Sequence, residues 1–301
     1  MDSLAATPGT GPATSPLPVI RAARKQRTFE DLPTDRTVVL GVLNVTPDSF
    51  SDGGRFARPD DAVAAGLRML YGGADIIDVG GESTRPNAVP VDPAEEQKRV
   101  LPVIETLAKA GALISIDTMN ASTAALALDA GAGIVNDVSG TDMDPDMPAL
   151  IAERGVPYVL MHGRGDARTM SGLAEYKDVV EDVLAEIMEV RDRLYNGGVS
   201  PEQIIVDPGL GFAKTEEHNW ALLRSLDRFD VLGHRLLIGT SRKRFLGTLL
   251  STSGKAAPPE ERDSATVATT ALAAAAGVWG VRVHDVAANL DAVKVSAAWN
   301  G

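Results

Sequence analysis

The chain has 301 residues, of which 44% are hydrophobic and 23% charged, as in a soluble globular protein with enough apolar side chains for a large core. Its formal net charge of -12 argues against a nucleic-acid-binding surface, because phosphate backbones are bound by clustered positive charge. The absence of cysteine excludes disulfides and thiolate-bound metals, and the four histidines do not form a zinc-binding spacing.

The N-terminal segment differs in composition from the rest of the chain. Residues 2–18 are rich in Ala, Thr, Pro and Gly and contain too few large apolar side chains to form a core. We therefore expect residues 1–36 to form a disordered or flexible tail and residues 37–301 to form a single domain. The sequence contains neither the apolar segment of a secretory signal nor a stretch long enough to span a membrane. These features predict a cytoplasmic protein with no membrane partner.

Eight short, β-branched apolar stretches follow, and each ends on a residue with a polar side chain. Apolar runs without alternation are typical of strands that are covered on both faces, as in a parallel sheet. Between them lie helical segments, at residues 60–71, 120–131, 175–195 and 263–277. The expected strands are residues 38–44, 74–82, 112–117, 133–137, 158–162, 204–207, 236–241 and 281–285.

This alternation of strands and helices predicts the fold class. Eight such units within about 250 residues favour an α/β fold of the (β/α)8 TIM barrel type over a doubly wound sheet, which usually has fewer strands. Barrel enzymes form their sites at the carboxyl ends of the strands. At these ends lie Asn44, Asp117, Asn136, Asp207 and His284.

Two glycine-containing loops follow the first and second expected strands. Pro47, Gly53 and Gly54 prevent a regular helix after the first strand and predict a mobile loop over the barrel mouth. Asn44 offers a carbonyl oxygen suited to Mg2+, although it could serve only to tether this loop. After the second strand, Arg85 is able to bind a phosphate or carboxylate, but turns of this composition are also common connectors.

Asp117, Asn136 and Asp207 present two carboxylates and an amide at the ends of three strands. A ligand with several adjacent N–H donors would satisfy them, such as the edge of a 2-amino-4-oxo pyrimidine ring. The alternative is that these carboxylates form internal salt bridges with Arg or Lys.

Positive charge is concentrated near the last two strands, at residues 241–245 and 282–284. Alternation along a strand places Arg282 and His284 on the same face. Together they predict a cationic wall for a pyrophosphate-sized anion, with Lys243 able to donate to a ring carbonyl and Arg282 able to stack on a flat heterocycle. A single Arg or His would more often have a structural role.

These segments together resemble the dihydropteroate synthase family from about residue 38 to residue 299. The resemblance implies condensation of 6-hydroxymethyl-7,8-dihydropterin pyrophosphate with 4-aminobenzoate, with Mg2+ as cofactor. It also implies a homodimer and competitive inhibition by sulfonamides. The motifs that carry the resemblance are residues 41–54, 82–86, 115–118, 136–140, 207–212, 241–243 and 282–284.

The same resemblance implies roles for individual residues. The catalytic set is Asp117, Lys243, Arg282 and His284. The pterin would bind Asp117, Asn136, Asp207 and Lys243, with Met161 and Arg282 covering its faces. The pyrophosphate and Mg2+ would be held by Asn44, Arg282 and His284. The 4-aminobenzoate region and its loops comprise Thr46, Pro47, Asp48, Ser49, Phe50, Asp52, Ser83, Thr84, Arg85, Pro86, Phe212 and Arg244.

The implied mechanism is dissociative: the C–O bond breaks first and leaves a delocalised pterin cation that the aniline nitrogen attacks. The carboxylates of Asp117 and Asp207 would stabilise this cation, and loop closure would exclude water. Arg244 stands where several relatives have Ser, near the expected carboxylate of 4-aminobenzoate, and is compatible with binding it.

Two other functions compete with this interpretation. A methyltetrahydrofolate methyltransferase on a related barrel would share the acidic residues, but not the loop at residues 46–53 or the basic residues near the last two strands. A non-catalytic pterin-binding protein would be expected to have lost one loop or some of the basic residues. All of these features are present in the sequence, which favours the synthase.

Overall fold

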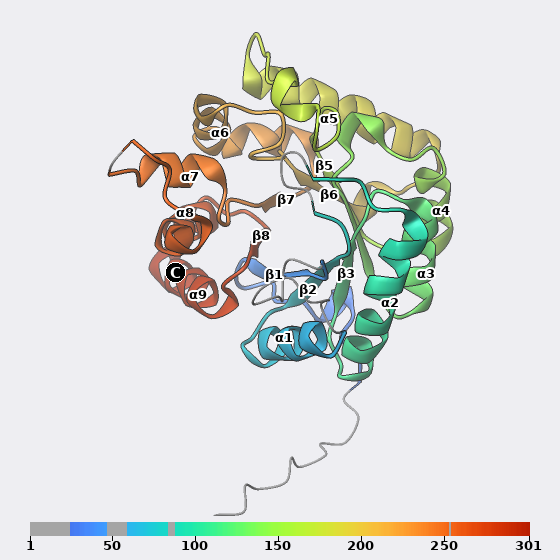
Figure 1. Ribbon diagram of the computed structural model, residues 1–301. Coiled ribbons are helices and arrows are strands. Elements are labelled where there is room, and N and C mark those ends of the chain that lie inside the picture. Colours follow the sequence, from blue (N-terminus) through green and yellow to red (C-terminus); the bar gives the residue numbers. More distant parts are fainter. Residues whose placement is uncertain (1–24, 47–58, 84–87, 253) are drawn as a thin grey trace, which may run out of the picture.

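The computed structural model describes residues 25–46, 59–83, 88–252 and 254–301. In these ranges eight parallel strands close into a barrel in the order β1 to β8, with β8 pairing back to β1 (Figure 1). This confirms the predicted TIM barrel. The strands are β1 (Val38–Asn44), β2 (Ile76–Gly80), β3 (Ile114–Asp117), β4 (Ile134–Asp137), β5 (Tyr158–Met161), β6 (Ile204–Asp207), β7 (Arg235–Ile238) and β8 (Gly280–Val283).

Helices surround the barrel on its outer side (Figure 1). Within the described ranges, no helix is long and apolar enough to cross a membrane. The α-helices are α1 (Pro59–Tyr71), α2 (Pro93–Lys109), α3 (Ala121–Asp129), α4 (Met147–Arg154), α5 (Val179–Asn196), α6 (Glu216–Leu223), α7 (Arg244–Leu249), α8 (Asp263–Ala275) and α9 (Val286–Asn300). The 3-10 helices are η1 (Phe29–Asp31), η2 (Gly140–Asp142), η3 (Met170–Leu173), η4 (Pro201–Gln203), η5 (Leu226–Leu232) and η6 (Pro259–Arg262).

Four strands, β2, β5, β7 and β8, end earlier than the sequence predicts, whereas the other four end where it predicts. The stretch at residues 281–285 forms a strand only to Val283, because the Asp285 side chain instead caps α9 by accepting a hydrogen bond from the Ala288 N–H at 3.3 Å. The stretch at residues 236–241 forms a strand only to Ile238. An apolar run thus predicts where a strand lies, but backbone pairing decides where it ends.

Alternation along the strands fills the barrel in two layers. Inward-facing side chains near the amino ends of the strands are apolar and form one buried cluster. Two residues further on, several strands place a polar side chain in the same inward direction, as where Ile76 is followed by Asp78 and Ile205 by Asp207. The lower cluster consists of Val38, Leu40, Ile76, Leu113, Ile134, Val159, Ile205 and Leu237. A polar layer therefore lies above an apolar one, beneath the barrel mouth.

Residues 25–36, which the sequence assigns to a flexible tail, pack across the end of the barrel where the strands begin. We call this the lower end, and the end with the mouth the upper end. Phe29 and Leu32 contact the lower apolar cluster, and the rings of Phe29 and Trp279 lie 5.8 Å apart. The guanidinium of Arg36 donates to both carboxylate oxygens of Asp75 at 2.7 Å. This aromatic packing and bidentate ion pair join residues 25–36 to the barrel. Residues 1–24 lie outside the described ranges, and the domain boundary itself stays a prediction.

Candidate active site

Four inward-facing polar side chains, from β2, β3, β4 and β8, form one connected group beneath the barrel mouth. Nε of Arg282 donates to Oδ2 of Asp78 at 2.6 Å, and Nη2 of Arg282 donates to Oδ2 of Asp117 at 2.5 Å. Nδ2 of Asn136 donates to the same oxygen of Asp78 at 3.1 Å. We call Asp78, Asp117, Asn136 and Arg282 the floor cluster. Three of its members are predicted from the sequence, and for Asp117 the alternative of an internal salt bridge is realised in this structure.

Asp78 is the member of the floor cluster that the sequence analysis missed. Its side chain is fully buried, and among the described residues its Oδ1 atom has no hydrogen-bond partner. A signal was available in the sequence, because an acidic residue inside the apolar run Ile76-Ile77-Asp78-Val79 needs a partner when it is buried. Its actual partners, Arg282 and Asn136, could not be predicted, because they come from strands far along the chain.

Burial makes the charges of the floor cluster interdependent. Burial raises the pKa of Asp117 to about 7, and the Asp78 carboxylate adds to this increase while Arg282 opposes it. Burial alone would lower the pKa of Arg282, but the carboxylates of Asp78 and Asp117 outweigh it and raise the pKa above its usual value. Arg282 therefore stays charged, whereas Asp117 can change its protonation state near neutral pH.

Asp207 and Lys243 lie beside the floor cluster. Oδ1 of Asp207 accepts a hydrogen bond from the backbone N–H of Gly209 at 2.7 Å, and burial raises the pKa of Asp207 against the effects of this bond and of Lys243. Burial lowers the pKa of Lys243 to about 8, and its Nζ lies 4.1 Å from the centre of the Phe212 ring. Met161 is buried and pairs with Asp207 in the register of β5 and β6. An acid, a base and an aromatic ring thus meet at one side of the mouth.

His284 follows β8 and is held by Ser241. Its Nδ1 lies 2.9 Å from Oγ of Ser241, and this oxygen also accepts a hydrogen bond from the His284 backbone N–H at 3.1 Å. Burial lowers the pKa of His284 to about 3, with further lowering by Arg282 and Arg242. The imidazole is therefore neutral near pH 7 and offers hydrogen bonding without charge.

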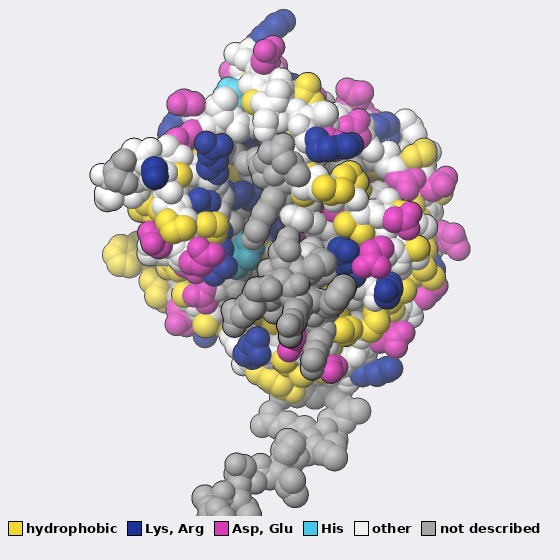
Figure 2. All heavy atoms as spheres, in the orientation of Figure 1, with side chains coloured by type: hydrophobic (Ala, Val, Ile, Leu, Met, Phe, Trp, Pro, Cys, Tyr) yellow, Lys and Arg dark blue, Asp and Glu magenta, His cyan; other side chains and the backbone are white. Residues whose placement is uncertain are grey.

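The predicted cationic wall thus has less free positive charge than its sequence indicates. Arg282 is paired with two carboxylates, His284 is neutral, and Arg242 is turned to Asp263, to which it donates through Nε and Nη2 at 2.8 Å. Lys and Arg side chains (dark blue) and histidine atoms (cyan) are nevertheless visible near the centre of the face in Figure 2. The sequence identifies the basic residues, but not the acids that compensate them.

Three further predicted loop residues lie within the described ranges. Thr46 is buried, Ser83 is partly buried, and Arg244 is exposed at the first position of α7. The predicted residues outside the described ranges are Pro47, Asp48, Ser49, Phe50, Asp52, Thr84, Arg85 and Pro86.

Asn44 is the predicted metal ligand, and it ends β1 opposite Gly80 of β2. Among the residues that the structure describes, no group of three or more His, Asp or Glu side chains could hold a metal ion. Asn44 fits a site for Mg2+ in which phosphate oxygens and water supply most of the ligands, an arrangement that this ion often adopts. It does not fit a metal cage built from protein ligands alone.

Comparison with known proteins gives one consistent result. A profile of the family described as "Pterin binding enzyme" matches residues 40–284. The dihydropteroate synthase of Mycobacterium leprae is 53% identical over 263 residues, which cover 87% of this chain and 93% of the relative. The dihydropteroate synthase of Xanthomonas albilineans, solved with 4-aminobenzoic acid, has a TM-score of 0.81 at 41% identity and covers 89% of this chain and 94% of its own. The dihydropteroate synthase of Yersinia pestis, solved in a sulfonamide drug complex, has a TM-score of 0.83 at 37% identity. The match covers 89% of this chain and 96% of the Yersinia pestis chain.

Proposed function

Because the chain belongs to the pterin-binding enzymes, among the dihydropteroate synthases, we propose a specific reaction and mechanism for it. The enzyme is a transferase of the pterinylmethyl group in folate synthesis. Its substrates are 6-hydroxymethyl-7,8-dihydropterin pyrophosphate and 4-aminobenzoate, and its products are 7,8-dihydropteroate and pyrophosphate.

The observation that carries this proposal is the buried set of acceptors at the base of the mouth. Asp117 and Asp207 are the last residues of β3 and β6, Asn136 is the second-last residue of β4, and all three are buried. The N–H groups of a pterin form a planar, guanidine-like edge, which such acceptors bind as they would bind a guanidinium. Lys243, close to Asp207, donates to the ring carbonyl.

We propose that the C–O bond breaks before the new C–N bond forms. The positive charge that develops on the pterin is stabilised by the carboxylates of Asp117 and Asp207, which lie in a buried environment where electrostatic interactions are strong. Arg282 donates to the departing pyrophosphate, and the neutral imidazole of His284 adds a hydrogen bond. The aniline nitrogen then attacks the methylene carbon and loses one proton.

Mg2+ is proposed to be held by Asn44 together with the oxygens of the pyrophosphate. When bound, it supplies positive charge that offsets the charge of the leaving group. This proposal is supported by the limited free positive charge of the site, because the guanidinium of Arg282 is shared with Asp78 and Asp117.

The 4-aminobenzoate is proposed to lie against Phe212, with Arg244 close to its carboxylate. Met161 covers one face of the pterin, and the loops that contain Thr46 and Ser83 close over both substrates. We expect sulfonamides to compete with 4-aminobenzoate, and the sulfonamide complex of the Yersinia pestis relative supports this.

We also propose that the enzyme is a homodimer, and its cytoplasmic location stays a prediction. Leu272 on α8 and Val295 and Trp299 on α9 are exposed by 71%, 63% and 85%. These two helices pack against each other, so their exposed apolar side chains form a candidate interface with a second copy. Light scattering of the purified protein tests this, and a monomer mass at micromolar concentration would contradict it.

The reaction is tested by incubating the purified protein with both substrates and Mg2+. We expect pyrophosphate and 7,8-dihydropteroate to appear only when the pterin pyrophosphate and 4-aminobenzoate are both present. Omission of Mg2+ with added chelator should reduce the rate strongly. Release of pyrophosphate at the full rate without 4-aminobenzoate would contradict the condensation.

A further inference from the structure

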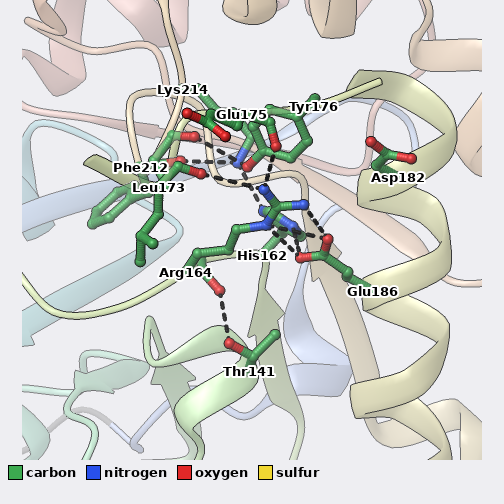
Figure 3. Close-up of polar contacts among 12 residues, drawn as sticks. Thr141, His162, Arg164, Leu173, Glu175, Tyr176, Asp182, Glu186, Phe212 and Lys214 are labelled. Carbon is green, nitrogen blue, oxygen red and sulfur yellow. Dashed lines mark hydrogen bonds and ion pairs between the residues drawn. The ribbon is translucent and has the colours of Figure 1, made fainter. Parts of the chain in front are cut away.

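A second charged network lies between the loops that follow β5 and β6 (Figure 3). Nζ of Lys214 is 2.8 Å from Nδ1 of His162 and donates to the carbonyl oxygen of Phe212 at 3.0 Å. On the other side of the imidazole, Nε2 lies 3.0 Å from Oε2 of Glu186, which projects from α5. Nε of Arg164 donates to the same oxygen of Glu186 at 2.9 Å. We call Lys214, His162, Glu186 and Arg164 the side cluster.

Hydrogen bonding determines the protonation states in the side cluster. A lysine ammonium only donates, so Nδ1 of His162 accepts from Lys214 and the ring proton lies on Nε2, facing Glu186. Burial lowers the pKa of His162 to about 4, which keeps the ring neutral. Burial alone would raise the pKa of Glu186, but hydrogen bonds from Arg164 and His162 lower it to about 2. A neutral imidazole therefore links an ammonium to a carboxylate, and each bond polarises the other.

The side cluster holds the loop that carries Phe212. Lys214 binds the carbonyl oxygen of Phe212, and the hydroxyl of Tyr176 donates to the next carbonyl oxygen, that of Ala213, at 3.0 Å. The guanidinium of Arg164 lies 3.9 Å above the centre of the Tyr176 ring, which fixes that ring in turn. Of these two successive carbonyls in the loop after β6, one is thus held by Lys214 of the same loop and the next by Tyr176 of the loop after β5.

Close packing in the first part of the same loop adds to this constraint. Gly209 has a φ of +66°, and a Cβ atom there would lie 1.8 Å from the carbonyl oxygen of His162. The loop therefore fits against β5 without space for a side chain. Gly209 thus fixes the first half of the loop against His162, and the Lys214 bond acts chiefly on the second half.

We propose that Lys214 is a positioning residue for the 4-aminobenzoate end of the site, because it fixes the Phe212 backbone and thereby the Phe212 ring beside Lys243. This inference rests on the proposed function. Lys214 does not touch the reacting atoms; it acts through Phe212. No role for Lys214 or Glu186 follows from the sequence motifs. The motif at residues 207–212 ends at Phe212, and Glu186 lies in none of them.

The positioning is expected to depend on pH. Lys214 is faced by Asp207 of β6, Lys243 after β7, Arg164 and His162 at β5, and Glu186 of α5. It also influences His218 of α6. Burial lowers the pKa of Lys214 to about 7, with Asp207 opposing and Lys243 and Arg164 adding to the effect. The charge-assisted bond to Phe212 is therefore strongest below pH 7 and weakens as the ammonium loses its proton above it.

The kinetic test compares Lys214→Met with Lys177→Met, which removes the same charge from an exposed lysine nearby. We expect Lys214→Met to raise the KM for 4-aminobenzoate about tenfold, the effect of losing one charge-assisted hydrogen bond. The KM for the pterin pyrophosphate should stay unchanged, and Lys177→Met should behave as the unmodified protein. Lys214→Arg should restore part of the loss. An unchanged KM for 4-aminobenzoate, or equal increases in both KM values, would overturn the proposal.

A second measurement does not require turnover. Hydrogen–deuterium exchange should be faster in residues 208–216 of Lys214→Met than in the unmodified protein, with unchanged exchange in the barrel strands. This result separates the two proposals, because it holds even if the protein fails to condense the two substrates. If Lys214→Met does not fold, Glu186→Gln keeps the hydrogen bond to His162 but removes the charge, and should raise the same KM to a smaller extent. Exchange in residues 208–216 that is as slow in both variants as in the unmodified protein would contradict the inference.

Discussion

Two acidic residues on the same side of the barrel, Asp75 and Asp78, show how its two ends differ. Asp75 lies just before β2, and both of its oxygens are paired, with Arg36 at 2.7 Å and with the backbone N–H of Val39 at 2.9 Å. Asp78 lies inside β2 and is equally buried, but only one of its oxygens has partners among the described residues. The unpaired oxygen of Asp78 is what we expect of a buried acid that also serves a ligand.

The partners of the two acids differ in the same way. Arg36 contacts Asp75 and the Thr37 carbonyl at the lower end, where Phe29 and Trp279 pack against the apolar cluster. Arg282 contacts Asp78 and Asp117 in the polar layer beneath the mouth. A ligand that brings its own charges can therefore replace these ion-pair partners at the upper end. This agrees with the usual division of a TIM barrel into a stabilising face and a catalytic face.

Replacement of Arg282 should have the largest effect, because this residue serves both the fold and the ligand. We expect Arg282→Met to lower kcat/KM about 1000-fold, as removal of a preorganised donor does. It should also lower the free energy of unfolding by about 3 kcal/mol, since it leaves Asp78 and Asp117 without their cation. Steady-state kinetics and urea unfolding measure the two effects. A loss of stability without a loss of activity would place Arg282 with the structural residues.

Replacement of Arg36 should separate the two ends of the barrel. We expect Arg36→Met to lower the free energy of unfolding by about 3 kcal/mol, because it leaves the buried Asp75 carboxylate without its partner. At a temperature where the variant is folded, its kcat/KM should equal that of the unmodified protein. A large fall in kcat/KM in the folded variant would show that the lower end influences catalysis.

The pH dependence of activity should report the upper end alone. Since the pKa of Asp117 is raised to about 7, its carboxylate form, which binds the pterin, is lost as the pH falls below this value. The pKa of Lys243, lowered to about 8, sets a second limit, because the ammonium is lost as the pH rises through it. We expect kcat/KM to be bell-shaped, with a maximum between these values, when measured from about pH 5.5 to about pH 9. A flat profile across this range would contradict both assignments.

The sequence predicts the upper end incompletely, for a physical reason. Apolar runs reveal eight strands, and the residues near their carboxyl ends reveal Asp117, Asn136 and Asp207, because strand position and inward direction follow from local pattern. The partners of Arg282 do not follow, since its guanidinium reaches across the barrel to β2 and β3. Which acid pairs with which base depends on side-chain reach in three dimensions.

The contacts at the lower end could not be predicted for a different reason. Arg36 and Phe29 lie in a polar, proline-containing segment without periodicity, so nothing local predicts that they pack. Arg36 and Phe29 are held in place by tertiary contacts, with Asp75 and Trp279 respectively. The resemblance to the synthase family begins after this segment and gives no information on it.

The most direct test of the central claim is calorimetric titration of 6-hydroxymethyl-7,8-dihydropterin pyrophosphate into the unmodified protein, Asp117→Asn and Arg36→Met. The account predicts that Asp117→Asn binds this ligand at least about tenfold more weakly, since a charged hydrogen-bond acceptor is lost, without losing stability. Arg36→Met should lose stability and keep its affinity. Equal affinities for the unmodified protein and Asp117→Asn would contradict the assignment of the upper end to pterin binding.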